Sequence, residues 1–177
     1  GHSLGLSHPF DGAYIAPTWM QIAAYSVMSY SGDGELINDW DIDGDGINEY
    51  SAGDWIAYQK PAINDIKTIQ YIYGMTPDFN AGNTTYTYSG PVWETIYDTG
   101  GIDTIDLSFY SGDFEKNIIL DLRGGKVSEI GTDEMVVWIY DPYTEDWTPQ
   151  NEGFQISISE NTVIENAKTG SGDDSIT

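Results

Sequence analysis

Negative charge is the feature that most restricts what this chain can fold into. The 177 residues include 29 Asp and Glu against 6 Lys and Arg, which gives a formal net charge of -23 at pH 7. Self-repulsion on this scale opposes a compact state unless cations or hydrogen bonds hold many of the carboxylates. The same charge repels phosphate backbones and anionic lipid surfaces, so we expect no nucleic acid partner and no membrane partner.

The aromatic content argues against the simplest alternative, a disordered acidic tail. The chain has 6 Trp, 13 Tyr and 5 Phe, and hydrophobic residues make up 40% of it, which is enough to build a core. Cysteine is absent, so neither a disulfide framework nor thiolate chemistry is expected. No run approaches the roughly 18 apolar residues of a membrane-spanning helix. Because residue 1 is Gly and no signal peptide opens the chain, we expect the natural start to lie further upstream.

One helix is predicted between residues 61 and 74. Pro61 suits a first helical turn, and Gly74 suits the residue that ends a helix. Between them four isoleucines recur at intervals of three, and Tyr73 extends their stripe, which we expect to be core: Ile63, Ile66, Ile69 and Ile72. Residues 31–58, rich in Asp, Gly and Trp, are expected to form loop.

From Thr76 onward the periodicity changes to short alternating runs separated by Gly, Asn and Asp. This pattern predicts strands at residues 85–88, 104–107, 117–122, 135–140 and 154–158. The polar, turn-rich stretch at 77–84 is typical of a boundary, so the chain is divided into residues 1–76 and 77–177. The expected fold class is α+β, with a mostly-β second part.

The chain has only two histidines, His2 and His8, and Gly5 lies midway between them. On an unbroken helix six residues turn through about 600°, which would place the two rings on different faces. A glycine can adopt the left-handed conformation that ends a helix, so a break at Gly5 would bring the rings together. The spacing therefore allows a shared metal ion, while two unrelated surface histidines remain the alternative.

Several motifs in order resemble a known family. His2, Gly5 and His8 match the second half of the metzincin pattern H-E-x-x-H-x-x-G-x-x-H, and Ser-Val-Met-Ser-Tyr at 26–30 resembles the Met-turn of those proteins. Met28 alone could be ordinary core packing, but the joint order of these residues makes that less plausible. Residues 65–74, D-I-K-T-I-Q-Y-I-Y-G, are similar to the last catalytic-domain helix, D-I-x-x-I-Q-x-x-Y-G. The chain thus resembles serralysin-type zinc metallopeptidases.

The resemblance implies a secreted, extracellular zinc metalloendopeptidase that acts on protein or peptide substrates through a metal-activated water. His2 and His8 would be zinc ligands, Met28 would lie beneath the metal, and Tyr30 would be an additional ligand that can stabilise the oxyanion. The first zinc histidine and the general-base glutamate would precede Gly1. We therefore expect the 177-residue chain to be inactive alone. A protein inhibitor would be a further partner.

An acidic loop predicts a calcium site independently of the resemblance. Residues 41–46, D-I-D-G-D-G, begin like an EF-hand loop, in which alternating carboxylates converge on Ca²⁺. Ala52 stands where that loop has its bidentate glutamate, which leaves Glu49 or Asp54 as substitutes. The candidate ligands are Asp41, Asp43, Asp45 and Glu49. A solvated acidic loop is the alternative.

The resemblance also implies a calcium signature at the start of the β-rich part. Residues 98–106, D-T-G-G-I-D-T-I-D, are similar to the family segment D-x-G-G-x-D-T-x-D. The implied calcium ligands are Asp98, Gly100 and Asp103.

Near the end of the chain Gly170, Gly172, Asp174 and Ile176 meet the RTX repeat G-G-x-G-x-D-x-U-x, with Thr169 in place of its first glycine. In that repeat the glycines turn the chain, and the aspartate and exposed carbonyls hold Ca²⁺. Several stacked repeats make a parallel β-roll, so we expect more repeats beyond residue 177. A Gly-Asp turn that arose by chance is the alternative.

Together these features favour the C-terminal part of a metzincin catalytic domain in residues 1–76 and a calcium-binding β domain in residues 77–177. The rival hypothesis is a non-enzymatic, calcium-binding secreted module of the RTX type. It accounts for the acidic segments but not for two histidines placed around Gly5. A third hypothesis is a relative that keeps the fold and has lost its glutamate.

Overall fold

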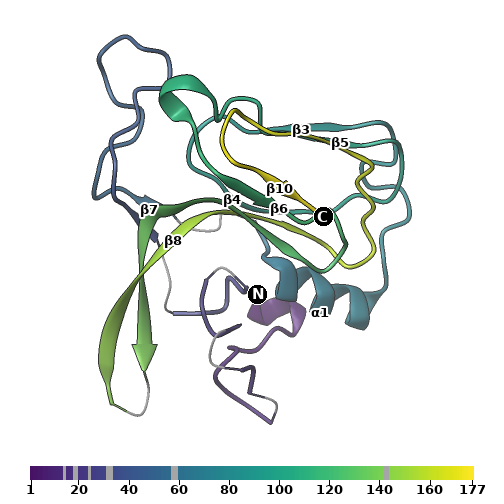
Figure 1. The fold of residues 1–177 in the computed structure, drawn as a ribbon. Coiled ribbons are helices and arrows are strands. Elements are labelled where there is room, and N and C mark those ends of the chain that lie inside the picture. Colours follow the sequence, from purple (N-terminus) through teal and green to yellow (C-terminus); the bar gives the residue numbers. More distant parts are fainter. Residues whose placement is uncertain (14, 18–19, 24, 31–33, 57–59, 142–143) are drawn as a thin grey trace.

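The computed structural model describes residues 1–13, 15–17, 20–23, 25–30, 34–56, 60–141 and 144–177, to which every structural statement applies. These residues form helix α1 (Ile63–Tyr73), the 3-10 helices η1 (His2–Leu4) and η3 (Gly112–Phe114), and ten strands (Figure 1). The strands are β1 (Gly34–Leu36), β2 (Trp55–Ile56), β3 (Thr85–Thr87), β4 (Trp93–Ile96), β5 (Thr104–Asp106), β6 (Ile118–Leu120), β7 (Val127–Asp141), β8 (Asp146–Ile158), β9 (Asn166–Lys168) and β10 (Ser175–Ile176). The α+β class is confirmed. No helix in this part of the chain is long and apolar enough to span a membrane.

In the β-rich part the chain passes three times from a three-stranded sheet to a larger sheet, and each of these passes is called a return. Strands β3, β5 and β9 pair in parallel, with Thr85, Thr104 and Asn166 in register. Each of them is followed in sequence by a strand of the larger sheet, namely β4, β6 and β10 respectively. The parallel pair β6 and β10 continues this stacking in the larger sheet.

In the larger sheet, a long hairpin of β7 and β8 lies between β4 of the first return and β6 of the second, although it follows β6 in sequence. β8 pairs in parallel with β4, and β7 pairs antiparallel with both β8 and β6. The larger sheet thus runs β4, β8, β7, β6, β10, and β1 and β2 join it at β7. The ladder of β7 and β8 is interrupted between Ile130 and Met135, where Gly131 has a φ of 70°. Beyond this bulge the hairpin projects away from the sheets (Figure 1).

The core lies where the two sheets face each other. The row of Tyr86, Ile105 and Ala167 across β3, β5 and β9 belongs to the same cluster as buried residues of the larger sheet. Among the latter, Ile118, Ile130, Phe154, Ile156 and Ile158 are fully buried. The alternation of buried and exposed residues in these short strands is what the sequence pattern predicted.

The expectation that residues 31–58 are loop was partly wrong. β1 and β2 pair with each other, and β1 pairs with β7 through Gly34 and Val137. Trp40 is 2% exposed and packs against the rings of Phe114 and Phe154. Short strands and a single buried indole leave no periodicity to detect, because they are stabilised mainly by partners far along the chain, in β7, η3 and β8. The boundary at residue 77 stays a prediction, and the pairing of β1 with β7 crosses it.

The helix prediction was correct in position and partly wrong about burial. α1 begins after Pro61 and the cap residue Ala62, and it ends at Gly74, which has a φ of 85°. Ile63 is buried, and Ile66 and Ile69 are partly buried. Ile72 and Tyr73 are 47% and 64% exposed, however, so the last turn of the stripe is not core.

All five predicted strand regions contain strands, but the hairpin strands are longer than predicted. β8 extends into exposed residues whose alternation carries no hydrophobic signal, and β7 begins earlier, at Val127, in a stretch that the bulge at Gly131 interrupts. β4 and β9 were missed, since each is only three or four residues long and takes its stability from parallel neighbours.

Candidate metal centre

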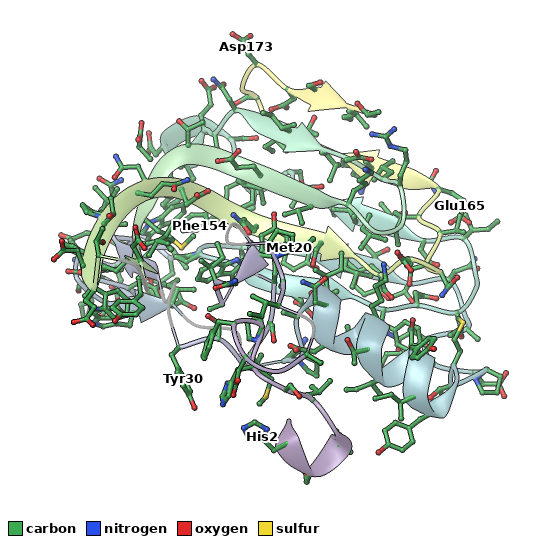
Figure 2. The ribbon with its side chains drawn as sticks, turned by 90° about the horizontal axis from the view of Figure 1, so that it is seen from below. His2, Met20, Tyr30, Phe154, Glu165 and Asp173 are labelled. Atoms are coloured by element: carbon green, nitrogen blue, oxygen red, sulfur yellow. The ribbon has the colours of Figure 1, made fainter. Side chains whose placement is uncertain are left out.

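The two histidine rings come together through a chain reversal at Gly5. η1 ends there with Gly5 at φ 84° and ψ 8°, and the Gly5 N–H donates to the carbonyl of His2 at 2.9 Å. The Nε2 atoms of His2 and His8 are 3.2 Å apart. The Tyr30 hydroxyl is 2.8 Å from His8 Nε2, and Tyr30 lies on the same side of the molecule as His2 (Figure 2). Three of the predicted zinc-site side chains are thus in one place.

Hydrogen bonds on the far side of each ring fix which nitrogens face one another. His2 Nδ1 lies 2.9 Å from the carbonyl oxygen of Leu6, and His8 Nδ1 lies 2.5 Å from that of Met28. A carbonyl oxygen only accepts, so each Nδ1 carries the proton and each neutral ring keeps its lone pair on Nε2. Two lone pairs therefore face each other at 3.2 Å.

That arrangement fits a zinc ion. Zn–N bonds of about 2.0–2.1 Å in tetrahedral geometry place two ligand nitrogens about 3.3 Å apart. Backbone carbonyls that accept from the other ring nitrogen are a common outer shell of metal-bound histidines. The rings are also partly accessible, His8 being half-buried and His2 exposed, so an ion could reach them.

Met28 packs directly under the histidine segment. Its side chain is buried, and a Cβ placed on Gly1 would lie 1.9 Å from its Sδ. Its turn is tied to α1 by Asp65, which is 2% exposed and accepts from the Ser26 hydroxyl at 2.6 Å. The sequence placed Asp65 in a structural helix and gave it no role at this site. An acidic residue at the third helical position indicates helix capping, which the hydrogen bond from the Ala62 N–H bears out, but it does not indicate the contact with Ser26.

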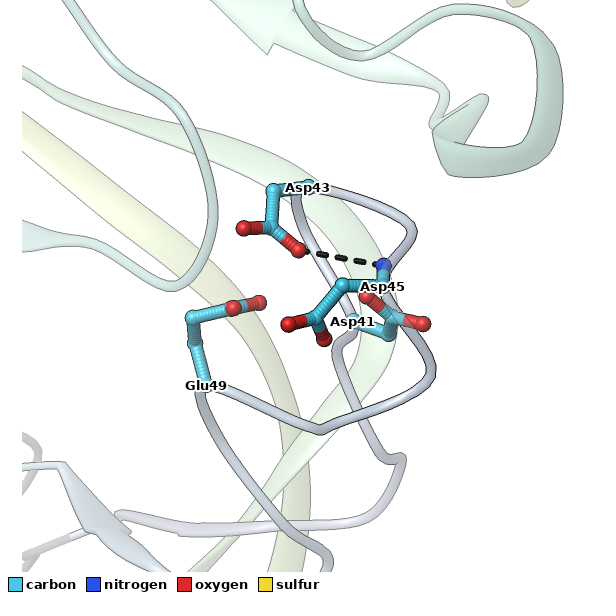
Figure 3. Close-up of side chains that lie close together, drawn as sticks. All are labelled: Asp41, Asp43, Asp45 and Glu49. Carbon is cyan, nitrogen blue, oxygen red and sulfur yellow. Dashed lines mark hydrogen bonds between the residues drawn. The ribbon is translucent and has the colours of Figure 1, made fainter.

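The acidic loop brings its four predicted side chains together. Ligand oxygens of Asp41, Asp43, Asp45 and Glu49 all lie within 4.8 Å of one another (Figure 3). The loop is closed at its base where Trp40 and Tyr50 form a bridge. Several loop N–H groups donate to these carboxylates, among them Gly44 and Gly46, each 2.8 Å from an Asp41 oxygen. Glu49 and not Asp54 joins the cluster, since Asp54 accepts from the N–H of Ser51.

A second acidic cluster is buried at the start of β5. Asp98 and Asp103 are 1% and 0% exposed. Asp98 Oδ1 accepts from the N–H of Gly100 at 2.9 Å, and its Oδ2 accepts from the hydroxyl of Tyr86 at 2.6 Å. Asp103 Oδ1 accepts from the N–H of Thr84, while Asp103 Oδ2 has no hydrogen-bond partner among the described residues.

The electrostatics around Asp103 favour a cation. Burial is the main cause that raises the pKa of the Asp103 carboxyl, and the negative charges of Asp98 and Glu165 raise it further. Glu165 Oε2 accepts from the N–H of Asp103 at 2.7 Å. Glu165 was missed by the sequence analysis because it is 62 residues from Asp103 in the chain. A buried carboxylate oxygen without a donor, close to other carboxylates, fits a hard divalent ion.

The RTX-like residues make close backbone contacts with the second return. A Cβ on Gly170 would lie 1.8 Å from the carbonyl oxygen of Tyr110, and one on Gly172 would lie 2.3 Å from that of Lys116. Asp174 Oδ1 accepts from the N–H of Ile118 at 3.0 Å. These contacts place β10 beside β6 and give both glycines a packing role. Whether Asp174 also binds calcium stays a prediction.

Comparison with known proteins gives a consistent set of relatives. No protein-family model matches the chain. The chain is 29% identical to Serralysin G of Dickeya chrysanthemi over 198 residues, which cover 99% of this chain and 34% of that protein. It is 28% identical to Metallopeptidase AprA of Pseudomonas marginalis (99% and 35%) and 30% identical to Serralysin of Photorhabdus laumondii (98% and 34%). The chain spans about a third of the length of these curated relatives.

Proposed function

We propose that this chain, which belongs to the serralysin-type metalloproteases, is the part of a zinc metalloendopeptidase that supplies two zinc ligands, the Met-turn and a calcium-binding β domain. The observation that carries the proposal is the 3.2 Å distance between His2 Nε2 and His8 Nε2, in rings whose Nδ1 atoms both lie beside backbone carbonyls. The parent protein would cleave peptide bonds in protein substrates. Its setting would be extracellular, where calcium is abundant enough for weak carboxylate sites.

The residues of this chain have distinct roles in the proposal. His2 and His8 hold the metal through Nε2, and their Nδ1–H groups orient the rings by donating to backbone carbonyls. A bound zinc ion would supply activation of a water molecule for attack on a peptide carbonyl. The exposed hydroxyl of Tyr30 lies close enough to His8 Nε2 to join the ligand set or to donate to an oxyanion.

The chain by itself lacks two parts of the proposed reaction. His2 and His8 are its only histidines, and the general-base position of the pattern they match lies before Gly1. We expect the isolated chain to hold zinc weakly and to cleave no substrate. Incubation of the purified chain with casein and zinc is the test, and cleavage that a chelator stops would contradict this expectation.

Zinc binding is tested by calorimetric titration of the chain. Micromolar or weaker binding is expected, lost in His2→Ala and in His8→Ala and reduced in Tyr30→Phe. The control is Tyr71→Phe, which removes an exposed hydroxyl on α1 and should leave binding unchanged. Zinc affinity that is the same in wild type and His8→Ala would refute the metal centre.

The proposed calcium ligands are in three groups. The first is Asp98, Gly100, Asp103 and Glu165, linked by hydrogen bonds near the start of β5, and the second is the acidic loop with Asp41, Asp43, Asp45 and Glu49. The third group is Gly170, Gly172 and Asp174, in the RTX-like segment. The stacked returns of β3, β5 and β9 support the proposal that a parallel β-roll begins here.

Calcium removal tests this part of the proposal. Unneutralised carboxylates repel one another, so we expect EGTA to loosen the β-rich part and calcium to restore it. Circular dichroism with and without EGTA is the measurement. A spectrum and unfolding midpoint that do not change would count against calcium binding.

A non-enzymatic calcium-binding module is the competing function, favoured by the acidic clusters alone. The two differ in what precedes Gly1, because only the peptidase needs His-Glu at the offset set by His2. The residues that precede Gly1 in the parent protein decide between the two functions. They also decide whether the parent keeps the fold of the family but has lost the glutamate.

A further inference from the structure

One buried carboxylate connects helix α1 to the turn beneath the histidines. Asp65 is 2% exposed and is the third residue of the helix. Its Oδ1 accepts from the Ser26 hydroxyl at 2.6 Å, and its Oδ2 accepts from the N–H groups of Val27 at 2.8 Å and Ala62 at 2.9 Å. One side chain thus holds the start of α1 and the Met28 turn together.

The contacts continue from Asp65 to the nitrogen that faces the metal position. The Ser26 oxygen, held by Asp65, accepts from the N–H of Met28 at 3.0 Å. The carbonyl of Met28 in turn accepts from His8 Nδ1 at 2.5 Å. The plane and the tautomer of the His8 ring therefore depend on where that carbonyl is held, and so does the direction of the Nε2 lone pair.

A carboxylate suits this position better than a neutral side chain. All three groups that approach Asp65 are donors, and two of them converge on a single oxygen. An amide of the same shape has one acceptor oxygen and one donor nitrogen, so it would leave the Ser26 hydroxyl facing a donor. Charged acceptors also form stronger hydrogen bonds, which offsets the cost of burying the charge.

We propose that Asp65 is a positioning residue of the metal centre, which sets the orientation of His8 through Ser26 and Met28. It does not touch the metal position or the substrate. The inference rests on the proposed zinc-binding function, because it assigns a residue that supports that same site. It adds α1, which was predicted to be structural only, to the elements that determine metal affinity.

Cobalt binding provides a readout other than activity. Co²⁺ in a site of nitrogen and oxygen ligands has visible absorption bands that report affinity and geometry together. Loss of an outer-shell partner lowers metal affinity by about 10- to 100-fold, so we expect that decrease in Asp65→Asn and in Ser26→Ala, with altered bands. In the double variant the losses should not add, because both changes interrupt one path.

The matched control is Ile63→Val, a buried change at the start of the same helix that leaves every hydrogen bond of Asp65 in place. It should lower the melting temperature but leave Co²⁺ affinity within about twofold of wild type. If Asp65→Asn fails to fold, the Co²⁺ affinity of Ser26→Ala tests the inference, since this variant loses only a single hydroxyl.

Two outcomes separate the inference from the proposal beneath it. If wild type binds Co²⁺ through His8 but Ser26→Ala and a folded Asp65→Asn bind it as tightly, the positioning role is refuted and the metal centre stands. If wild type binds no Co²⁺, or binds it equally after His8→Ala, the metal centre itself is refuted and the inference falls with it.

Discussion

At the scale of single residues, Gly5 decides whether the two histidines meet. Its φ of 84° lies in the left-handed region, and a Cβ there would meet only Ile72 Cδ1, at 3.8 Å. The cost of a side chain at this position is therefore conformational and not steric.

We predict that Gly5→Ala lowers the free energy of unfolding by about 1–2 kcal/mol and weakens zinc binding. Urea unfolding and zinc titration are the measurements. Gly5→Asn should lose less, because asparagine tolerates this conformation. Gly82→Ala is the control, since nothing lies within 4 Å of its added carbon and its φ is not positive. Equal effects of Gly5→Ala and Gly82→Ala would show that the turn is not restrictive.

Asp103 gives the second prediction at this scale. In EGTA, Asp103→Asn removes a buried charge near Asp98 and Glu165, so the variant should be more stable than wild type by about 1–3 kcal/mol. In calcium the order should reverse, because the variant loses a ligand. Thermal unfolding in both buffers is the measurement. A variant that is less stable in both buffers would contradict the cation site.

These residues also show what the sequence can and cannot predict. The spacing of His2, Gly5 and His8 allowed a break at Gly5 to be predicted, whereas Tyr30 was expected at the site only from the resemblance to a known family. The roles of Asp65 and Glu165 were not predictable, because the groups that they contact are distant in the sequence. Val27 lies 38 residues from Asp65, and Asp103 lies 62 residues from Glu165. A single sequence contains no signal that pairs an acid with a distant backbone N–H.

At the scale of elements, a cross-strand ion pair joins β5 to β9. Asp106 and Lys168 are register partners, with Lys168 Nζ 2.9 Å from Asp106 Oδ2. This bond to Lys168, followed by hydrogen bonds from Ser108, lowers the pKa of the Asp106 carboxyl to about 2.

The pH dependence follows from the sign of that shift. The pKa in the folded state lies below the unfolded value of about 3.9, so the stabilisation is complete above about pH 4 and is lost as the pH falls toward 2. We predict that Asp106→Asn costs up to about 1 kcal/mol at pH 6, since Lys168 is largely exposed. The difference from wild type should shrink in urea unfolding below pH 4. Asp113→Asn, an exposed change in η3, should show no such trend.

The glycines before β10 give a prediction that separates packing from calcium binding. Gly170→Ala places a carbon against the Tyr110 carbonyl and should cost about 1–3 kcal/mol by overpacking. The loss should already be present in EGTA, because the contact needs no ion. Chemical unfolding in both buffers checks this, and a loss seen only in calcium would show that the contact with the Tyr110 carbonyl is not restrictive.

Helix α1 was the most predictable element, because its isoleucine spacing, Pro61 and Gly74 are all local signals. β7 and β8 were only partly predictable. Their buried ends alternate between apolar and polar residues, whereas their outer ends are stabilised by pairing with each other. β1 was not predictable, since its three residues gain strand structure from pairing with the two-residue β2 and with the distant β7.

At the scale of the whole molecule, the net charge of -23 must be balanced by ions. We predict that in EGTA the melting temperature rises steeply between about 0.02 and 1 M NaCl, as the screening length falls to about 3 Å. In calcium the rise should be smaller, because the carboxylates that repel most are already held. Sucrose, which carries no charge, should raise both melting temperatures equally. A salt response that is the same in both buffers would contradict calcium neutralisation.

The hairpin inserted between β4 and β6 has a consequence for the order of folding. Asp141 and Asp146, which pair at the tip of the hairpin, are close neighbours in sequence. Trp93 in β4 pairs with Gln155 in β8, which is 62 positions later in the chain. Loop closure over such a separation is slow, so the local unit of β6, β7 and β8 should consolidate first. A growing chain would then pair β3 with β5 early, whereas β4 would lack its partner strand β8 until residue 158 had been added.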